Sequence, residues 1–107
     1  MITTKDFKEI LSRLIPYDYE MEVVVQYNDK IYGTYEVFSD TGHDICFKIE
    51  YNENCFKNVT VGEICTLIFM TDSNNNYFFD VLIDDYTAMD VKEIEYSRDM
   101  SFIVLKI

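Results

Sequence analysis

The chain has 107 residues, with 20 Asp and Glu against nine Lys and Arg, so its formal net charge is −11. This charge repels phosphate backbones and excludes direct binding to nucleic acid, whereas it attracts basic proteins at long range. Hydrophobic residues make up 49% of the chain, which excludes a disordered polymer and predicts a single domain over residues 1–107. No apolar run resembles a signal peptide or approaches the roughly 20 residues that span a bilayer, so we expect a cytoplasmic protein without a membrane partner.

The first predicted element is an amphipathic helix over residues 4–15. Thr3 and Asp6 have the spacing of a capping box, in which each side chain accepts a hydrogen bond from the backbone N–H of the other. Pro16 ends the helix because it has no backbone N–H to donate. Between these two signals an apolar stripe runs at helical spacing, formed by Phe7, Ile10, Leu11 and Leu14.

Beyond Pro16 the hydrophobic period changes to two, which predicts strands. Asn28 and Asp29 separate the first two strands and tolerate the positive φ angles of a tight hairpin. Residues 64–70 are apolar almost throughout, which indicates a strand covered on both faces. The predicted strands, about six or seven in number, are residues 21–27, 30–38, 45–51, 64–70, 77–83, 91–96 and 101–107.

The order of these elements predicts an α+β fold, with the amino-terminal helix packed on a predominantly antiparallel sheet. Short turns rather than helices separate the strands, and parallel pairs need longer crossovers. Several strands are apolar on both faces, as residues 101–107 illustrate. One helix cannot cover so much sheet. We therefore expect a partly closed barrel, or a partner such as a second copy in a homodimer that covers the exposed sheet face.

Candidate metal sites fail at positions that the chemistry requires. Residues 72–76 open like a calcium-binding loop, but Tyr77 stands where glycine is needed and Ile83 where glutamate is needed. The segment is instead typical of a hairpin turn. The aspartates within residues 84–90 offer carboxylates to a hard cation, yet adjacent aspartates at the end of a strand more often face water. We therefore expect no metal.

The residues for nucleophilic catalysis also lack the required context. Cys46, Cys55 and Cys65 are spaced for neither a disulfide framework nor a paired zinc motif, so we interpret them as reduced core thiols. His43, the single histidine, lies in a predicted turn without a nucleophile motif. Three glycines are too few for a phosphate-binding loop. We expect no catalytic residue, no cofactor and no enzymatic activity, and an enzyme built on one carboxylate is the remaining alternative.

Tyrosines beside carboxylates are the second informative feature, since the chain has nine Tyr and no Trp. Tyrosine gives a large contact area at low entropic cost, and a neighbouring carboxylate can hold an arginine in a bidentate pair. Each tyrosine alone is also a good strand residue, which is the simpler interpretation. We expect partner binding at two segments without basic residues, and the predicted contact residues are Tyr17, Asp18, Tyr19, Glu20, Glu22, Asp80, Asp84, Asp85, Tyr86 and Asp90.

Together these features predict a non-enzymatic inhibitor or binding protein that neutralises a basic partner, such as a nuclease or another nucleic-acid-binding protein. An immunity protein of a toxin nuclease fits this description, as does a phage-encoded inhibitor such as an anti-CRISPR protein that acts as a nucleic-acid mimic. Carboxylates placed where such a partner expects phosphates accelerate association. The alternative is a small ligand-binding or accessory β-barrel domain with a pocket lined by Phe47, Phe69 and Phe79.

Overall fold

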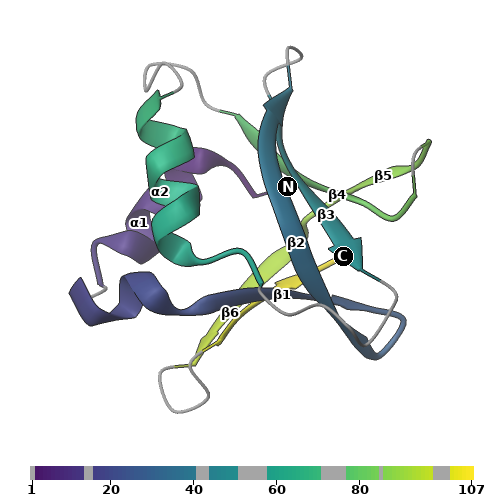
Figure 1. The fold of residues 1–107 in the computed structure, drawn as a ribbon, viewed down its shortest axis with the longest axis horizontal. Coiled ribbons are helices and arrows are strands. Elements are labelled where there is room, and N and C mark those ends of the chain that lie inside the picture. The colour runs from purple at the N-terminus through teal and green to yellow at the C-terminus, as the bar shows by residue number, and fades with distance from the viewer. Residues whose placement is uncertain are drawn as a thin grey trace.

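One mixed sheet organises the molecule (Figure 1). The computed structural model describes residues 2–13, 16–40, 44–50, 58–70, 77–84, 86–97 and 102–107. Its elements are α1 (Thr4–Leu11), the 3-10 helix η1 (Pro16–Glu20), β1 (Glu22–Tyr27), β2 (Lys30–Asp40), β3 (Asp44–Glu50), α2 (Val61–Met70), β4 (Phe78–Leu82), β5 (Ala88–Asp90), β6 (Glu93–Ser97) and β7 (Phe102–Lys106). Within the described ranges seven strands form the sheet, in the order β5-β4-β3-β2-β1-β7-β6. The fold is α+β, as the sequence predicts.

The prediction of a strand at residues 64–70 is wrong, because this segment belongs to helix α2. The backbone N–H of Glu63 donates to Oγ1 of Thr60 over 3.2 Å, which caps the first turn. Val61, Ile64 and Ile68 are buried at helical spacing, whereas Phe69 is 88% exposed. The apolar run therefore reflects a helix with apolar side chains on its buried and exposed faces rather than a strand covered on both sides.

The sheet is mixed, so the prediction of a predominantly antiparallel sheet is correct only in part. β1 pairs with β7 in parallel, and β3 pairs with β4 in parallel, while the other neighbouring pairs are antiparallel. Parallel neighbours need a crossover, which is usually a helix. Helix α2 lies between β3 and β4 in the chain and provides that crossover. The assignment of α2 as a strand therefore also hid the parallel pairing of β3 with β4.

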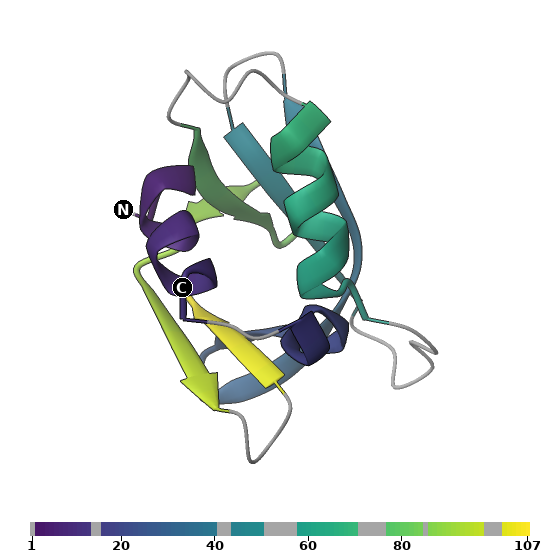
Figure 2. The same cartoon turned by 90° about the vertical axis from the view of Figure 1, so that its left-hand side faces the viewer.

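The sheet curls into a half-barrel whose two edge strands follow each other in the chain. β5 pairs with β4, and β6 pairs with β7 at the other edge. Between them the backbone N–H of Val91 donates to Phe79 O over 3.0 Å, and that of Lys92 donates to Lys106 O over 2.8 Å. Figure 2 shows the resulting curvature around the interior. The strand predicted at residues 91–96 corresponds to β6 at one edge of the sheet, and β5, at the other edge, precedes the predicted range.

Helix α1 packs on the sheet through Phe7, which is fully buried. Its ring lies 5.2 Å from that of Phe79, which in turn lies 5.5 Å from the ring of Phe47. The predicted capping box is confirmed, since the N–H of Thr3 donates to Oδ2 of Asp6 over 2.9 Å and the N–H of Asp6 donates to Oγ1 of Thr3 over 3.3 Å. α1 ends at Leu11, earlier than predicted, and Leu14 lies outside the described residues.

The three phenylalanines expected to line a ligand pocket do not surround one space. Phe47 and Phe79 are packed together inside the core, with exposed fractions of 0% and 1%. Phe69 points away from that core on α2. The interior of the half-barrel is therefore filled by side chains at this position, as in small barrels generally.

The hairpin between β1 and β2 forms as predicted. Asn28 and Asp29 have φ angles of 51° and 63°, and the flanking Tyr27 and Lys30 are paired in the ladder. Two positive φ angles define the turn type that matches the right-handed twist of the strands. Asn and Asp tolerate this conformation better than other residues with a side chain. The local sequence therefore fixes this register.

Candidate partner-binding site

Carboxylates from three neighbouring strands gather on the outer side of the sheet. Asp80 on β4 lies opposite Asp90 on β5, and Asp44 at the start of β3 lies opposite Phe78. Phe79 alternates with these residues and points into the core. The turn after β4 adds further residues to the same hairpin. We define the acidic face as Asp44, Phe78, Asp80, Asp84, Tyr86 and Asp90.

Asp80 is the central residue of the acidic face, with an exposed fraction of 8%. Burial, which is the largest cause, and the neighbouring carboxyls of Asp44 and Asp90 together raise the pKa of the Asp80 carboxyl from 3.8 to about 7. Each of these contributions raises the pKa, and the charged groups among them are other carboxylates. Asp80 is therefore partly protonated at neutral pH, and the charges that raise its pKa belong to the carboxylates of Asp44 and Asp90.

A hydrogen bond between a side chain and the backbone lies within the turn between β4 and β5. The N–H of Tyr86 donates to Oδ1 of Asp84 over 2.8 Å, and this bond lowers the pKa of the Asp84 carboxyl. Such a turn keeps Asp84 charged at neutral pH. The Tyr86 side chain is 98% exposed and that of Phe78 is 39% exposed. The acidic face therefore combines fixed negative charge with accessible aromatic surface.

The second predicted contact segment, residues 17–22, has a partly structural role. Asp18 is buried and accepts a hydrogen bond from the Tyr96 hydroxyl over 3.0 Å, which ties η1 to β6. Glu22 accepts a bond from Nδ2 of Asn58 over 3.4 Å. Glu20 is exposed, and Tyr19 is 45% exposed. The carboxylate of Asp18 is thus committed to the fold rather than to the surface.

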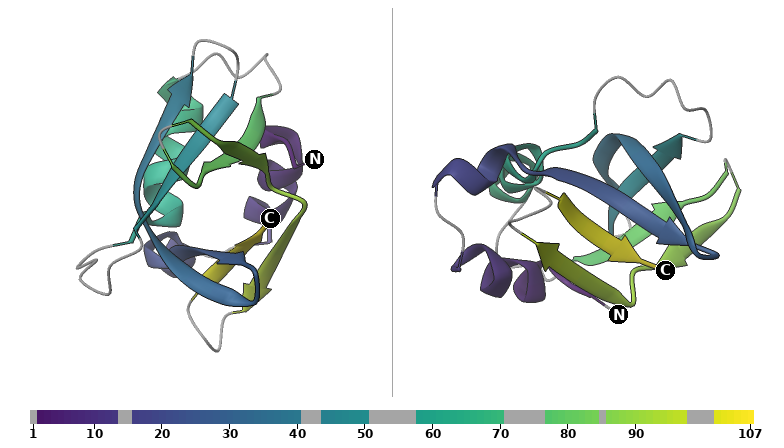
Figure 3. Two further views of the ribbon diagram at one scale, coloured as in Figure 1. Left: turned by 90° about the vertical axis from the view of Figure 1, so that its right-hand side faces the viewer. Right: turned by 90° about the horizontal axis from the view of Figure 1, so that it is seen from below.

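The structure does not bring the two predicted contact segments together. In Figure 1, η1 lies at one end of the long axis and the β4–β5 hairpin lies at the other, and the view from below in Figure 3 agrees. The Tyr17 side chain and the whole of Asp85 lie outside the described residues. A single flat contact surface can therefore include either the acidic face or residues 17–22. Of these two surfaces, only the acidic face brings together carboxylates from different strands.

Asp44 and Phe78 belong to the acidic face but are not among the contact residues predicted from the sequence, and Asp44 is the charged one of the two. It precedes the predicted strand 45–51 by one position, and it approaches Asp80 only because β3 and β4 are parallel neighbours. An antiparallel pairing would place other residues beside Asp80. The missed helix at α2 therefore also concealed this member of the site.

Metal-binding and thiol chemistry receive no further support from the described part of the chain. Among the described residues, no group of three or more His, Cys, Asp and Glu side chains has a geometry that could hold a metal ion. Residues 72–76, His43 and Cys55 lie outside the described ranges. Cys46 is buried and Cys65 is half-buried, and both are free thiols. Burial raises the pKa of the Cys65 thiol, which makes it a weaker nucleophile at neutral pH.

Comparison with known proteins gives no relative. No protein-family model matches the chain, and neither the curated proteins nor the solved structures include a significant match. In the described residues, neither α1 with its eight residues nor α2 with its ten reaches the length of an apolar helix that crosses a membrane. The interpretation of the site therefore depends on the chemistry of its own residues.

Proposed function

We propose that this chain is a non-enzymatic binding protein that neutralises a basic partner protein through the acidic face. The observation that carries the proposal is the placement of Asp80, which is buried between Asp44 and Asp90 with its pKa raised to about 7. A cluster of like charges is unfavourable in the free protein. A cation brought by a partner relieves this repulsion, so binding gains energy at this position.

The chemistry of the contact follows from the arrangement of charges. A lysine or arginine beside Asp80 lowers the pKa of that carboxyl, which then releases its proton and forms an ion pair. Arginine suits the site better, because its planar guanidinium can bond two carboxylate oxygens at once. Phe78 and Tyr86 add exposed aromatic area beside the charges. Aromatic and arginine side chains commonly meet in the well-packed centre of protein interfaces.

The whole chain supports the same partner class. Its net charge of −11 accelerates encounters with a positive surface and repels other anions. A nuclease or another nucleic-acid-binding protein presents such a surface to phosphates. We therefore place the chain among proteins that occupy such a surface, in the manner of an immunity protein of a toxin nuclease or an anti-CRISPR protein that mimics nucleic acid.

Affinity capture from the source cells with two matched baits tests this proposal. The wild-type protein is compared with the double variant Asp84→Lys and Asp90→Lys, whose side chains are exposed. The control variant, Glu9→Lys and Glu20→Lys, changes the net charge equally on α1 and η1, where both side chains are also exposed. We expect a basic nucleic-acid-binding protein on the wild-type and control baits and its loss from the acidic-face variant. Equal capture by all three baits, or capture of acidic proteins only, would contradict the proposal.

A further inference from the structure

β2 is the longest described strand, with eleven residues, and its two halves have different neighbours. Residues 30–33 pair with β1, whereas residues 33–40 pair with β3 on the opposite side of the strand. The side of residues 34–40 that faces away from β3 therefore has no neighbouring strand in the described part of the chain. Such an edge presents backbone N–H and C=O groups that another strand can bind.

Thr34 marks the point where this edge begins. Its backbone N–H donates to Oδ1 of Asn58 over 3.0 Å, and its carbonyl accepts the N–H of Val59 over 3.1 Å. The chain then enters α2 and leaves the edge of β2. Within the described ranges, residues 35–40 form no backbone hydrogen bond to another backbone group outside the ladder with β3. We call residues 35–40 the free edge.

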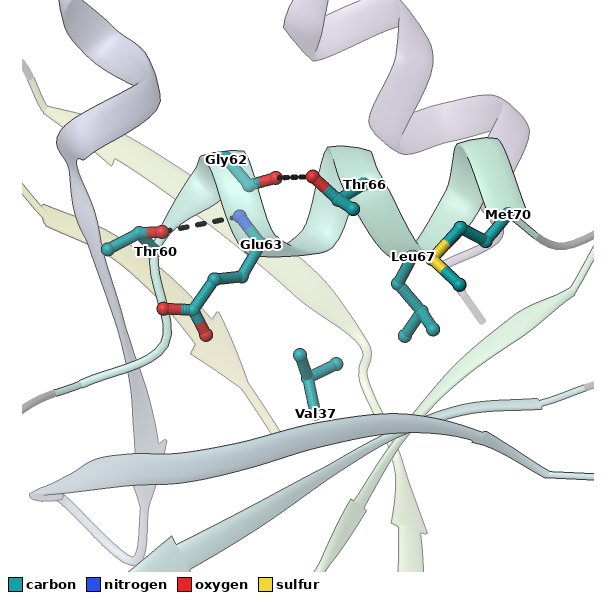
Figure 4. Close-up of a pocket in the computed structure, with 7 residues that line it drawn as sticks. All are labelled: Val37, Thr60, Gly62, Glu63, Thr66, Leu67 and Met70. Atoms are coloured by element: carbon teal, nitrogen blue, oxygen red, sulfur yellow. Dashed lines mark hydrogen bonds between the residues drawn. The ribbon is translucent and has the colours of Figure 1, made fainter.

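Helix α2 lies beside the free edge and leaves a groove between them. Figure 4 shows Leu67 and Met70 on the helix and Val37 on the strand turned toward a common space. The volume of the groove is about 540 Å³. Leu67 and Val37 are half-buried and Met70 is 77% exposed, so apolar side chains of both walls are accessible. The lining is completed by Thr60, Gly62, Glu63 and Thr66.

The dimensions of the groove suit an extended segment. The free edge has six residues and is about 20 Å long, and α2 with its ten residues is about 15 Å long. An added strand lies about 4.8 Å from its neighbour in a sheet. About four or five extended residues therefore fit between the free edge and α2.

The free edge lacks two features that commonly protect an exposed edge from pairing. Lysine side chains and proline are typical protections, and residues 31–47 contain no Lys, Arg or Pro. A shift of the register between Thr34 and Glu36 twists the strand where the edge begins. Beyond this shift, residues 36–40 pair regularly with β3. The backbone of the free edge therefore has the regular conformation that a further strand requires.

We propose that the free edge binds an extended, basic segment of a partner protein, which adds a strand to the sheet between β2 and α2. Backbone hydrogen bonds provide the affinity in this mode of recognition. Charge complementarity selects a basic segment, because the chain has a net charge of −11 and the stretches that form the two walls, residues 31–47 and 58–91, contain no Lys or Arg. The attraction comes from the field of the whole chain rather than from one ion pair. A second copy of the chain has the same charge and is repelled.

The sequence of the bound segment follows from the geometry of a strand. Successive side chains of a strand point to opposite faces of the sheet. Every second side chain of the segment therefore points into the groove, toward Val37, Leu67 and Met70, and should be apolar. The side chains between them point to the outer side of the sheet, where Lys or Arg stays in water. We expect an alternation of apolar and basic residues.

The free edge and the acidic face lie on different elements, so this binding mode goes beyond the proposed function. The groove is formed by α2 and β2, whereas the acidic face lies on β3, β4, β5 and the turn between the last two strands. One partner can use both surfaces, and each can also act without the other. Variants in one surface are consequently suitable controls for the other.

Selection from a random-peptide library displayed on phage tests the proposal, with the folded full-length chain as the target. Enriched peptides are synthesised, and their affinity is measured by fluorescence anisotropy for the wild type, Met70→Lys and Phe69→Lys. These two variants change the charge equally at neighbouring exposed positions of α2, but only Met70 lines the groove. Circular dichroism verifies that both variants fold.

Two further measurements report on the backbone contacts. In the first, each residue of a peptide is N-methylated in turn, which removes one backbone donor. In the second, hydrogen exchange of the amides of residues 35–40 is compared with and without the peptide. The double variant Asp84→Lys and Asp90→Lys is the control for binding at the acidic face.

We expect affinity to fall about tenfold or more for Met70→Lys and to stay within about threefold for Phe69→Lys at high salt. N-methylation should weaken binding about tenfold at every second peptide residue and little at the residues between them, because only alternate N–H groups of an added strand face β2. Exchange at the free edge should slow about tenfold or more on binding. The acidic-face variant should bind within about twofold of the wild type at high salt, which separates failure of the free edge from failure of the proposed function.

Several outcomes overturn the inference. An absence of enrichment is one, and enrichment of acidic peptides is another. Equal losses for Met70→Lys and Phe69→Lys, or N-methylation effects without a period of two, would show that the peptide does not add a strand at the free edge. A dimer in sedimentation experiments that Met70→Lys dissociates would assign the groove to a second copy of the chain. Loss of peptide affinity only in the acidic-face variant would place the peptide on that face instead.

Discussion

Asp80 on β4 lies directly opposite Asp90 on β5 in the antiparallel ladder, so two carboxyl groups are neighbours on one side of the sheet. Two carboxylates offer only acceptors and repel each other, so the pair is relieved when one of the two carboxyls keeps its proton. The raised pKa of Asp80, about 7, identifies it as the group that keeps the proton. Like charges directly opposite each other on neighbouring strands destabilise the pair, and protonation of Asp80 reduces this repulsion.

The first prediction concerns the pH dependence of stability. The pKa of Asp80 is 3.8 in the unfolded chain and about 7 in the fold, so its contribution to stability is fully present below pH 3.8 and is lost as the pH rises through 7. Asp80→Asn removes this titration but keeps a hydrogen-bond donor. We expect the variant to be more stable than the wild type by roughly 1 to 2 kcal/mol at pH 8 and nearly as stable as the wild type at pH 4. The expected gain at pH 8 is smaller than the full pKa shift implies, because solvent screens the charges of the pair.

Urea denaturation of both proteins at the two pH values measures this difference. The control is Asp84→Asn, since the pKa of Asp84 is lowered by the N–H of Tyr86 and its charged form is the favoured one. This control should show no gain in stability at pH 8. An equal effect of Asp80→Asn at pH 4 and pH 8 would show that the aspartate cluster is not a source of repulsion.

The second prediction concerns association kinetics with a basic partner captured through the acidic face. Reversal of Asp84 and Asp90 to Lys should slow association by about tenfold at low ionic strength and by much less at high salt, because exposed charges are screened beyond about 8 Å at 0.15 M. The control reversal of Glu9 and Glu20 should slow it less. Stopped-flow association rates over a range of salt concentrations give the comparison. Identical salt dependence for the two double variants would mean that net charge alone steers the encounter.

The third prediction tests the assignment of Asp18 to the fold. Tyr96→Phe removes the hydroxyl that bonds Oδ2 of Asp18 over 3.0 Å, and Asp18 is buried. Loss of a bond to a buried charged group should destabilise the chain by about 1 to 3 kcal/mol. Association with the partner should be unchanged. Tyr86→Phe is the control, because that side chain is 98% exposed and should leave stability within about 0.5 kcal/mol.

Thermal or urea unfolding measures both tyrosine variants. A Tyr96→Phe protein that keeps its stability but loses partner binding would reassign Asp18 and its surroundings to the contact surface. That result would favour residues 17–22 over the acidic face.

Local signals in the sequence predict the elements that local chemistry determines. The Thr3–Asp6 capping box and the Asn28-Asp29 hairpin depend on neighbouring residues only, and both form as expected. The alternation of β7 also holds, with Ile103 and Leu105 fully buried. Periodicity and turn chemistry are sufficient where no distant segment decides the outcome.

Helix α2 shows where sequence periodicity alone was insufficient. Its apolar run satisfies the pattern of a buried strand, because Phe69 and Met70 are exposed and blur the helical stripe. The decisive signal was Thr60 followed three residues later by Glu63, which is a helix-start pattern. The same pattern marks the start of α1 at Thr3, and a helix that starts at Thr60 implies a crossover between parallel strands.

The candidate site was predictable in composition but not in arrangement. The lack of basic residues in their segment predicts Asp80, Asp84 and Asp90 as contact residues, and these three do gather at one hairpin. The position of Asp44 near Asp80 and the burial of Asp80 both depend on which strands lie beside β4. The packing of the whole sheet sets that strand order.

The last prediction tests the cap of α2, the helix that connects the parallel strands β3 and β4. Ten residues are too few for a stable isolated helix, so α2 relies on its cap and on its packing. Thr60→Ala removes the hydroxyl that accepts the Glu63 N–H and should reduce the free energy of unfolding by about 1 kcal/mol. Thr66→Ala is the matched control, because its hydroxyl bonds Gly62 O inside the helix and alanine is the better helix former. Denaturant unfolding should therefore find this control unchanged or slightly more stable. A similar loss in both variants would show that threonine packing, rather than capping at Thr60, stabilises this end of α2.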